Sequence, residues 1–249
     1  MGLDLNGPDK TLANYLCETP MHHSAPIYFG NPSYKDSKVS NGTATLIKKN
    51  NHLYAVTNHH VLSEYLERKK KDNDITLQIG GLYVPAISEI VLFDDKDVDI
   101  CVFHFPNHQE SDFWMNGDVP TKFYELGENF DDEITGTVVA FGGYPGSFRS
   151  RGSTNHVSFR TVSSGCSVIE DKSDLNIVVS INHDKDAITL LGETPPPEDI
   201  AGMSGGPVFE IVRENNLTCL RLVGIIYECS NDFKVLFVRP LSLFADAFY

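Results

Sequence analysis

The feature that most constrains this 249-residue chain is a succession of short apolar segments separated by Gly, Asn, Asp and Pro. Many of the segments are rich in Val, Ile, Phe and Thr and have the length of a β-strand. One set lies between residues 25 and 103 and a second between 136 and 238. Short strands at fairly regular spacing are typical of an all-β sandwich or barrel. Two helices are also expected, over residues 60–71 and near 241–248.

The stretch from residue 110 to 127 divides the two sets of strands, which predicts two β-subdomains. The chain is long enough for two small β-barrels that share a substantial core. We therefore expect an N-terminal arm over residues 1–24, with mild helical character, a first barrel over 25–120 and a second barrel over 121–249.

Charge and composition exclude several classes of function. The net charge of −14 disfavours binding to nucleic acid or to anionic membrane surfaces, because both are negative. No secretory signal is readable in the first twenty residues, which carry Asp4, Asp9 and Glu18. No later apolar run is long enough to span a bilayer. We expect no membrane partner.

The five cysteines indicate a reducing environment. They lack C-x-x-C spacing, so neither a zinc site nor a disulfide framework is predicted. A cytoplasmic location fits thiols of this kind best. The adjacent pair His22 and His23 has no further ligand at a suitable spacing, so we predict an unstructured pair and no metal.

Residues 201–209 read Ala-Gly-Met-Ser-Gly-Gly-Pro-Val-Phe, which places Ser204 among three glycines. Glycine permits tight turns and close backbone approach. Such a turn can direct several amide N–H groups to one point beside the Ser204 hydroxyl, the geometry that a serine nucleophile needs. The alternative interpretation is an ordinary Gly-rich turn before a strand over residues 208–212.

A candidate base and a candidate acid precede this serine. Thr57-Asn58-His59-His60-Val61 follows an apolar strand, and imidazole is well suited to exchange a proton near neutral pH. Asp97 and Asp99 stand before the apolar segment 100–103. A histidine or aspartate of this kind is usually structural when it occurs alone. Together the motifs occur in the order His, Asp, Ser, which is one known order of a catalytic triad.

These motifs make the chain resemble the trypsin-like serine peptidases of the chymotrypsin fold. The resemblance is carried by residues 57–61, by Asp-Ile-Cys-Val at 99–102 and by Gly-Met-Ser-Gly-Gly-Pro at 202–207, and it covers about 25–248. Within the family the chain looks most similar to the non-disulfide bacterial and intracellular branch, which includes the high-temperature-requirement proteases. The resemblance implies an all-β fold of two packed six-stranded antiparallel barrels. It also implies a short helix after the histidine and a C-terminal helix.

The resemblance further implies a serine endopeptidase that acts on polypeptides without a cofactor. The histidine of the family motif directly precedes Val or Cys, which selects His60 over His59. The aspartate of the family precedes apolar residues on a strand, which selects Asp99 over Asp97. Ser204 would be the nucleophile, and the amides of Gly202 and Ser204 would form the oxyanion hole.

One departure from the family concerns activation. Met203 stands where secreted digestive members keep an aspartate that pairs with a newly cut N-terminus. That route of activation is therefore not expected, and control would come from elsewhere, for example from an activating protein partner.

The walls of the specificity pocket are also assigned by the resemblance. The residues on one side are Glu198, Asp199 and Ile200, and those on the other are Ile226, Tyr227, Glu228 and Cys229. Glu198 lies six positions before Ser204, as the pocket-base residue of the family does, which leads to the hypothesis of cleavage after Lys or Arg. The equally open alternative is that Glu198 and Asp199 are solvated loop charges.

Two other functions stay open from the sequence alone. A catalytically silent relative would keep the double barrel as a peptide-binding or protein-binding module. An interaction domain could add a partner peptide as an edge strand near Tyr227.

Overall fold

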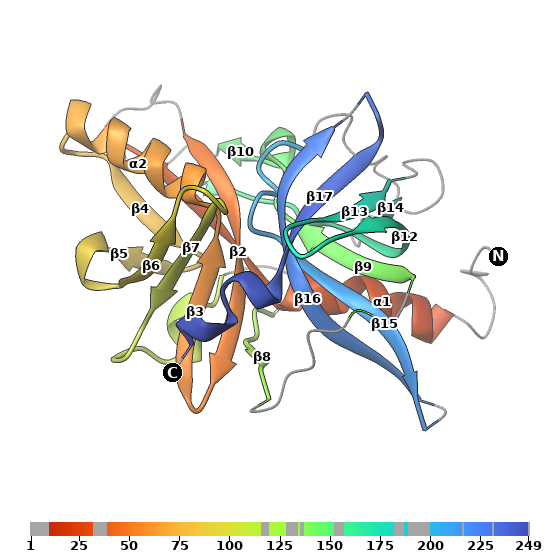
Figure 1. Ribbon diagram of the computed structural model, residues 1–249. Helices are drawn as coiled ribbons and strands as arrows, with labels where there is room; N and C mark the ends of the chain where they lie inside the picture. The colour runs from red at the N-terminus through yellow and green to blue at the C-terminus, as the bar shows by residue number, and fades with distance from the viewer. Residues whose placement is uncertain are drawn as a thin grey trace.

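The computed structural model describes residues 10–31, 39–115, 120–127, 134, 137–151, 157–181, 187–188, 200–215, 217–230 and 232–248. Its strands form two large sheets that pack side by side (Figure 1). This confirms the predicted all-β class and the two-barrel organisation. Within the described residues two α-helices accompany the sheets, α1 (Lys10–His22) and α2 (His59–Lys71).

The first sheet is a curled sheet built around the strands that lead to the candidate histidine and aspartate. Strand β8 pairs with β2 in parallel, whereas the other pairs are antiparallel. In spatial order the strands are β5 (Leu82–Val84), β4 (Thr76–Ile79), β1 (Ser24–Gly30), β2 (Ser40–Lys49), β3 (His52–Thr57), β7 (Ile100–His104) and β6 (Val91–Asp95), with β8 (Tyr124–Glu125) on β2.

The second sheet closes into a six-stranded ring. An additional pairing between β12 and β13 joins the two ends of the path. The ring runs β13 (Ile177–Ser180), β17 (Val235–Pro240), β16 (Leu217–Ser230), β15 (Pro207–Glu214), β9 (Val138–Gly143) and β12 (Val162–Lys172), and β14 (Ala187–Ile188) pairs with β12. A separate small ladder joins β10 (Ser150–Arg151) to β11 (Val157–Ser158).

The core of the protein consists of three clusters of buried apolar side chains. One fills the first sheet and another fills the second. The third lies between them and joins side chains of both sheets, among them Tyr54 and Val102 from the first and Phe209 and Leu222 from the second. The predicted boundaries at 24/25 and 120/121 remain predictions, and β8 shows that the chain returns to the first sheet after residue 121.

The expected C-terminal helix is wrong in type. Residues 241–248 form two 3₁₀ turns, η4 (Leu241–Leu243) and η5 (Ala245–Ala247), whose amides bond three residues back. Leu241, Phe244 and Phe248 are buried in the cluster between the sheets. An apolar spacing of three to four residues fits either kind of helix, so the sequence pattern did not distinguish a 3₁₀ helix from an α-helix.

The N-terminal arm is more ordered than the sequence predicted. Helix α1 packs against β9 and β12 and buries Leu16 and Met21. The prediction of an unstructured His22–His23 pair is wrong, because Nδ1 of His22 donates to the Pro120 carbonyl at 2.7 Å and Nδ1 of His23 to the Lys122 carbonyl at 3.2 Å. Sequence periodicity could not reveal contacts across about a hundred residues.

The remaining helical turns are short. They are η1 (Ile87–Glu89), η2 (Glu110–Phe113) and η3 (Gly146–Phe148). Among the described residues, no helix combines the length and the apolarity needed to cross a bilayer.

Candidate active site

His60 lies in the first turn of α2, directly after β3. The predicted helix over residues 60–71 is confirmed with a start one residue earlier, at His59. Strand β3 is buried up to Thr57, whereas the His60 side chain is 50% exposed, so the imidazole faces the surface at the end of a core strand. That exposure leaves it accessible to a bound substrate.

Asp99 lies in the turn between β6 and β7 and contacts His60 twice. Oδ2 accepts a hydrogen bond from Nδ1 of the His60 ring at 2.8 Å, and Oδ1 accepts one from the His60 backbone amide at 2.9 Å. Its φ of 56° is in the left-handed region, which is unusual for a residue with a side chain. Asn58 Nδ2 donates to the Asp99 carbonyl at 2.9 Å and so holds this backbone in place.

The pairing with Asp99 fixes the tautomer of His60. An ionised carboxylate can only accept hydrogen bonds, so Nδ1 carries the proton. Nε2 is then the basic nitrogen of the neutral ring. Asp97, the other candidate acid, donates its backbone amide to Asp95 Oδ1 and belongs to the turn.

Ser204 lies in a turn that needs its glycines. Gly202 and Gly205 have φ values of 100° and 89°, a region that L side chains rarely adopt. A Cβ on Gly205 would lie 2.0 Å from the Thr43 carbonyl oxygen, and one on Gly202 would lie 2.8 Å from the Gly146 amide nitrogen. The turn is therefore close-packed against the first sheet on one side and against η3 on the other.

The amides of the turn divide into two groups. Met203, Gly205 and Gly206 donate to the carbonyls of Ile200, Ile226 and Met203, at 3.1, 2.7 and 2.8 Å. Within the part of the chain that the structure describes, the amides of Gly202 and Ser204 donate to no protein acceptor. These two are the amides that the sequence assigned to an oxyanion hole, and they remain available to a ligand.

Thr43 of β2 connects this turn to the first sheet. Its amide donates to the Ser204 carbonyl at 2.8 Å, and its hydroxyl donates to the Gly202 carbonyl at 2.8 Å. The same hydroxyl accepts the Tyr144 amide at 3.0 Å, and the Thr43 carbonyl accepts the Thr57 hydroxyl at 2.7 Å. One buried threonine thus links β2, β3, β9 and the serine turn.

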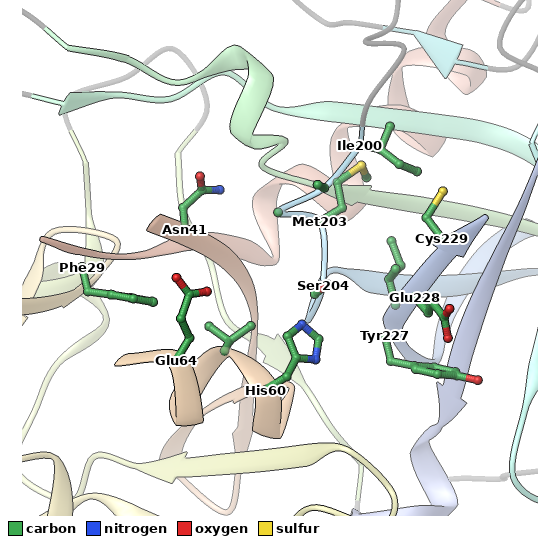
Figure 2. A pocket seen from close by; sticks show the side chains of 14 residues that line it. Phe29, Asn41, His60, Glu64, Ile200, Met203, Ser204, Tyr227, Glu228 and Cys229 are labelled. Carbon is green, nitrogen blue, oxygen red and sulfur yellow. The ribbon is translucent and has the colours of Figure 1, made fainter. Parts of the chain in front are cut away.

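His60 and Ser204 line the same pocket, which has a volume of about 380 Å³. Figure 2 shows the His60 ring beside the turn that carries Ser204, with Phe29, Asn41 and Glu64 on one side and Ile200, Cys229 and Glu228 on the other. Asp99 stands behind His60, with a side chain 20% exposed. The pocket lies where the two sheets meet, because β1, β2 and α2 border it on one side and the serine turn and β16 on the other.

Three of the five residues predicted to bind substrate line this pocket, namely Tyr227, Glu228 and Cys229. Tyr227 donates its hydroxyl to Asn176 Oδ1 at 3.1 Å, and the Arg239 guanidinium lies 3.9 Å from the centre of its ring. Burial raises the pKa of Tyr227, so its hydroxyl stays protonated at neutral pH. Glu198 and Asp199 lie outside the described residues.

The sequence did not identify the side of the pocket that the first sheet supplies. Phe29, Asn41 and Glu64 line it, and Asn41 Nδ2 donates to the Tyr144 carbonyl at 2.9 Å. Glu64 could have been found from its spacing, because it stands one helical turn after His60. Phe29 and Asn41 carry no local signal, since the pairing of β1 with β2 brings them together.

The serine hydroxyl is not yet engaged. Among the described residues, Ser204 Oγ forms no hydrogen bond, with His60 or with any other group. Catalytic hydrogen bonds are often long or absent without substrate and form in the complex.

Comparison with known proteins gives a distant similarity. No family model and no curated protein matches the chain. Among solved structures the chain is similar to the Rv3671c protease of M. tuberculosis in its active form, with 16% identity and a TM-score of 0.47 over 97% of this chain and 85% of that one. At that score the similarity carries no argument about mechanism, which has to come from this chain's own residues.

Proposed function

We propose that this protein is a serine endopeptidase in which Ser204, His60 and Asp99 form the catalytic triad. The observation that carries the proposal is the double contact of Asp99 with His60, at 2.8 and 2.9 Å, beside a pocket that Ser204 also lines. A surface histidine with a fixed tautomer, next to a serine in a Gly-rich turn, has the parts of a nucleophile, a base and an orienting acid.

The proposed chemistry is acyl transfer in two steps. Ser204 Oγ attacks the scissile carbonyl while His60 Nε2 takes the hydroxyl proton, and Asp99 stabilises the imidazolium that forms. The amides of Gly202 and Ser204 donate to the oxyanion of the tetrahedral intermediate, and each such donor is typically worth about 10²–10³ in rate. His60 then gives its proton to the leaving amine. Water hydrolyses the acyl-enzyme by the same route in reverse.

We further propose that the enzyme prefers peptide substrates that carry a lysine or arginine next to the scissile bond. Glu228 is an exposed carboxylate that lines the pocket next to Cys229, and no lysine or arginine is among the described lining residues. The protein as a whole carries a net charge of −14, which attracts cationic peptides. A Glu228→Gln variant should lower kcat/KM for peptides with Lys or Arg at the preferred position more than for neutral peptides.

Binding without catalysis is the second candidate, and the unengaged Ser204 hydroxyl favours it. A protein of this fold without catalytic activity would bind a peptide through the β16 segment near Tyr227, where the pairing with β15 ends at Ile225. Membership of the non-disulfide branch is likewise a proposal, which fits the finding that the five cysteines, all in described residues, form no disulfide.

The deciding experiment is intact-mass analysis after exposure to a fluorophosphonate probe. The proposal expects one adduct on the folded protein and none on the Ser204→Ala variant. Absence of an adduct on the wild-type protein, with retained binding of peptides from a library, would support the binding module instead. If an adduct forms, the same library read for cleavage identifies the preferred residue.

A further inference from the structure

A second histidine–aspartate pair lies directly beside the first. His59 Nδ1 donates to Asp94 Oδ1 at 2.7 Å, and His60 Nδ1 donates to Asp99 Oδ2 at 2.8 Å. The two histidines are consecutive in the first turn of α2, and the two carboxylates belong to the β6–β7 hairpin. Each residue of the outer pair is about one-third exposed, with side chains 29% and 30% accessible.

The start of α2 depends on the hairpin for its contacts. Asn58 occupies the N-cap position, but its side chain makes no capping bond and instead donates to the Asp99 carbonyl. The acceptor that helix amides normally find in a cap residue is supplied by Asp99 Oδ1, which accepts the His60 amide. The position of the first helical turn is therefore set by β6 and β7 as well as by the preceding strand.

The hairpin places both carboxylates in one rigid frame. Asp94 pairs with Cys101 across β6 and β7, and Asp99 stands two residues before Cys101. The hydrogen bond from His59 to Asp94 therefore fixes the distance between α2 and the hairpin. It does so at the residue directly before His60, whose ring is held by Asp99. Without the His59–Asp94 bond, the side-chain hydrogen bonds that remain between α2 and the hairpin, within the described residues, are those of Asp99 with His60.

We propose that His59 and Asp94 form a positioning pair for the His60–Asp99 interaction. This inference rests on the proposed function only for its effect on rate. The outer pair touches neither the pocket nor Ser204. It holds the first turn of α2 against the hairpin and so keeps Nδ1 of His60 within hydrogen-bond distance of Asp99. Misplacement of a catalytic group by about 1 Å can lower a rate by about 10²-fold.

The test uses variants that remove or keep the donor. His59→Ala removes the donor and Asp94→Ala removes the acceptor, so each variant breaks the pair. His59→Asn keeps a donor at nearly the position of Nδ1. His52→Ala is the matched control, because His52 is also a surface histidine bonded across strands, to His104 Nε2 at 3.1 Å, but lies away from α2.

The first readout is the rate of fluorophosphonate labelling, followed by kcat and KM on a cleaved peptide. We expect His59→Ala and Asp94→Ala to label roughly tenfold more slowly, with the loss in kcat rather than in KM. His59→Asn should recover most of the rate, and His52→Ala should match the wild-type protein. Equal rates in all four variants would overturn the proposal while leaving the serine peptidase intact.

The second readout does not need activity. The proton between His60 Nδ1 and Asp99 should give a low-field ¹H NMR signal, measured in the Ser204→Ala background. It should be present with His59→Asn and His52→Ala, and broadened or lost with His59→Ala. An unchanged signal in His59→Ala would overturn the positioning role even if the protein never hydrolyses a peptide bond. Thermal melting of each variant separates loss of position from loss of fold.

Discussion

Asp99 uses both of its carboxylate oxygens on a single residue, His60, one on the ring nitrogen and one on the backbone amide. The contact therefore orients the imidazole and anchors the first turn of the helix that carries it. The backbone of Asp99 is in the left-handed region, with a φ of 56°. The orientation of the proposed base and the position of the first turn of α2 therefore depend on the same carboxylate.

The Asp99→Asn variant should remain folded but lose nearly all activity. The amide that replaces the carboxylate can donate to Nδ1, which favours the tautomer with the proton on Nε2, and that tautomer cannot accept the serine proton. We expect kcat to fall by about 10⁴-fold, as for comparable triads. Asp97→Asn is the control in the same turn and should keep its activity. Similar kcat values for the two variants would argue against Asp99 as the orienting acid.

The serine turn makes a strong prediction about stability. Gly205→Ala places a Cβ 2.0 Å from the Thr43 carbonyl oxygen at a φ of 89°, so the turn must shift or the strands must part. We expect a loss of about 3 kcal/mol or more, because strain and collision add. The melting temperature should fall by about 10 °C. Gly127→Ala, where a Cβ meets nothing within 4 Å, is the control and should melt close to the wild type.

His23 predicts how stability depends on pH. Burial lowers the pKa of His23 from 6.5 to about 4, so the folded protein holds this imidazole neutral while the unfolded chain binds a proton. The free energy of unfolding should therefore carry no penalty from His23 above about pH 6.5. It should fall as the pH drops toward 4, by up to roughly 3 kcal/mol.

Urea unfolding at several pH values tests this. A His23→Asn variant lacks the titrating group, so its stability should decline less steeply over the same interval, whatever its absolute value. An equal slope in both proteins would assign the acid sensitivity to other groups.

Glu210 and Arg221 form a cross-strand ion pair between β15 and β16. The Glu210 side chain is fully buried, and Arg221 Nη2 and Nε donate to its Oε2 at 2.6 and 3.2 Å. Arg221→Met leaves a buried carboxylate without this partner and should cost about 3–5 kcal/mol. The double variant Glu210→Leu/Arg221→Met should recover much of that loss. Chemical unfolding of both variants checks this, and additive losses would mean that the pair is not coupled.

The sequence predicted the elements of this fold better than their contacts. The segment before Val61 and the segment after Asp99 carry strong local patterns, so the strand, helix and turn that hold the candidate base and acid could be anticipated. The 3₁₀ turns after Pro240 could not be distinguished from an α-helix by spacing. Contacts across long separations left no trace, including His22 with Pro120 and Thr43 with Gly202, because they depend on tertiary packing.

The residues of the candidate site could be predicted where a local sequence motif marks them, but not where the fold brings distant residues together. Ser204 is marked by its glycines, and His60 by the strand before it. Helix residue His59 has its partner, Asp94, on strand β6, 35 residues away in the sequence. The Glu198 and Asp199 hypothesis falls on residues that the structure does not describe. The family motif selected His60 over His59, and it is His60 that contacts Asp99.

Thr43 belongs to one sheet, yet two of its four polar contacts hold the serine turn of the other. The turn of the proposed nucleophile is therefore shaped by the half of the molecule that also carries the proposed base. Neither half contains all of the proposed site by itself, and a separation of the sheets would remove the two hydrogen bonds by which Thr43 holds the turn. In such an arrangement, any activity depends on how the two halves pack against each other. A ligand that binds at the interface of the two sheets and moves them apart or holds them together would therefore change that activity without contacting Ser204.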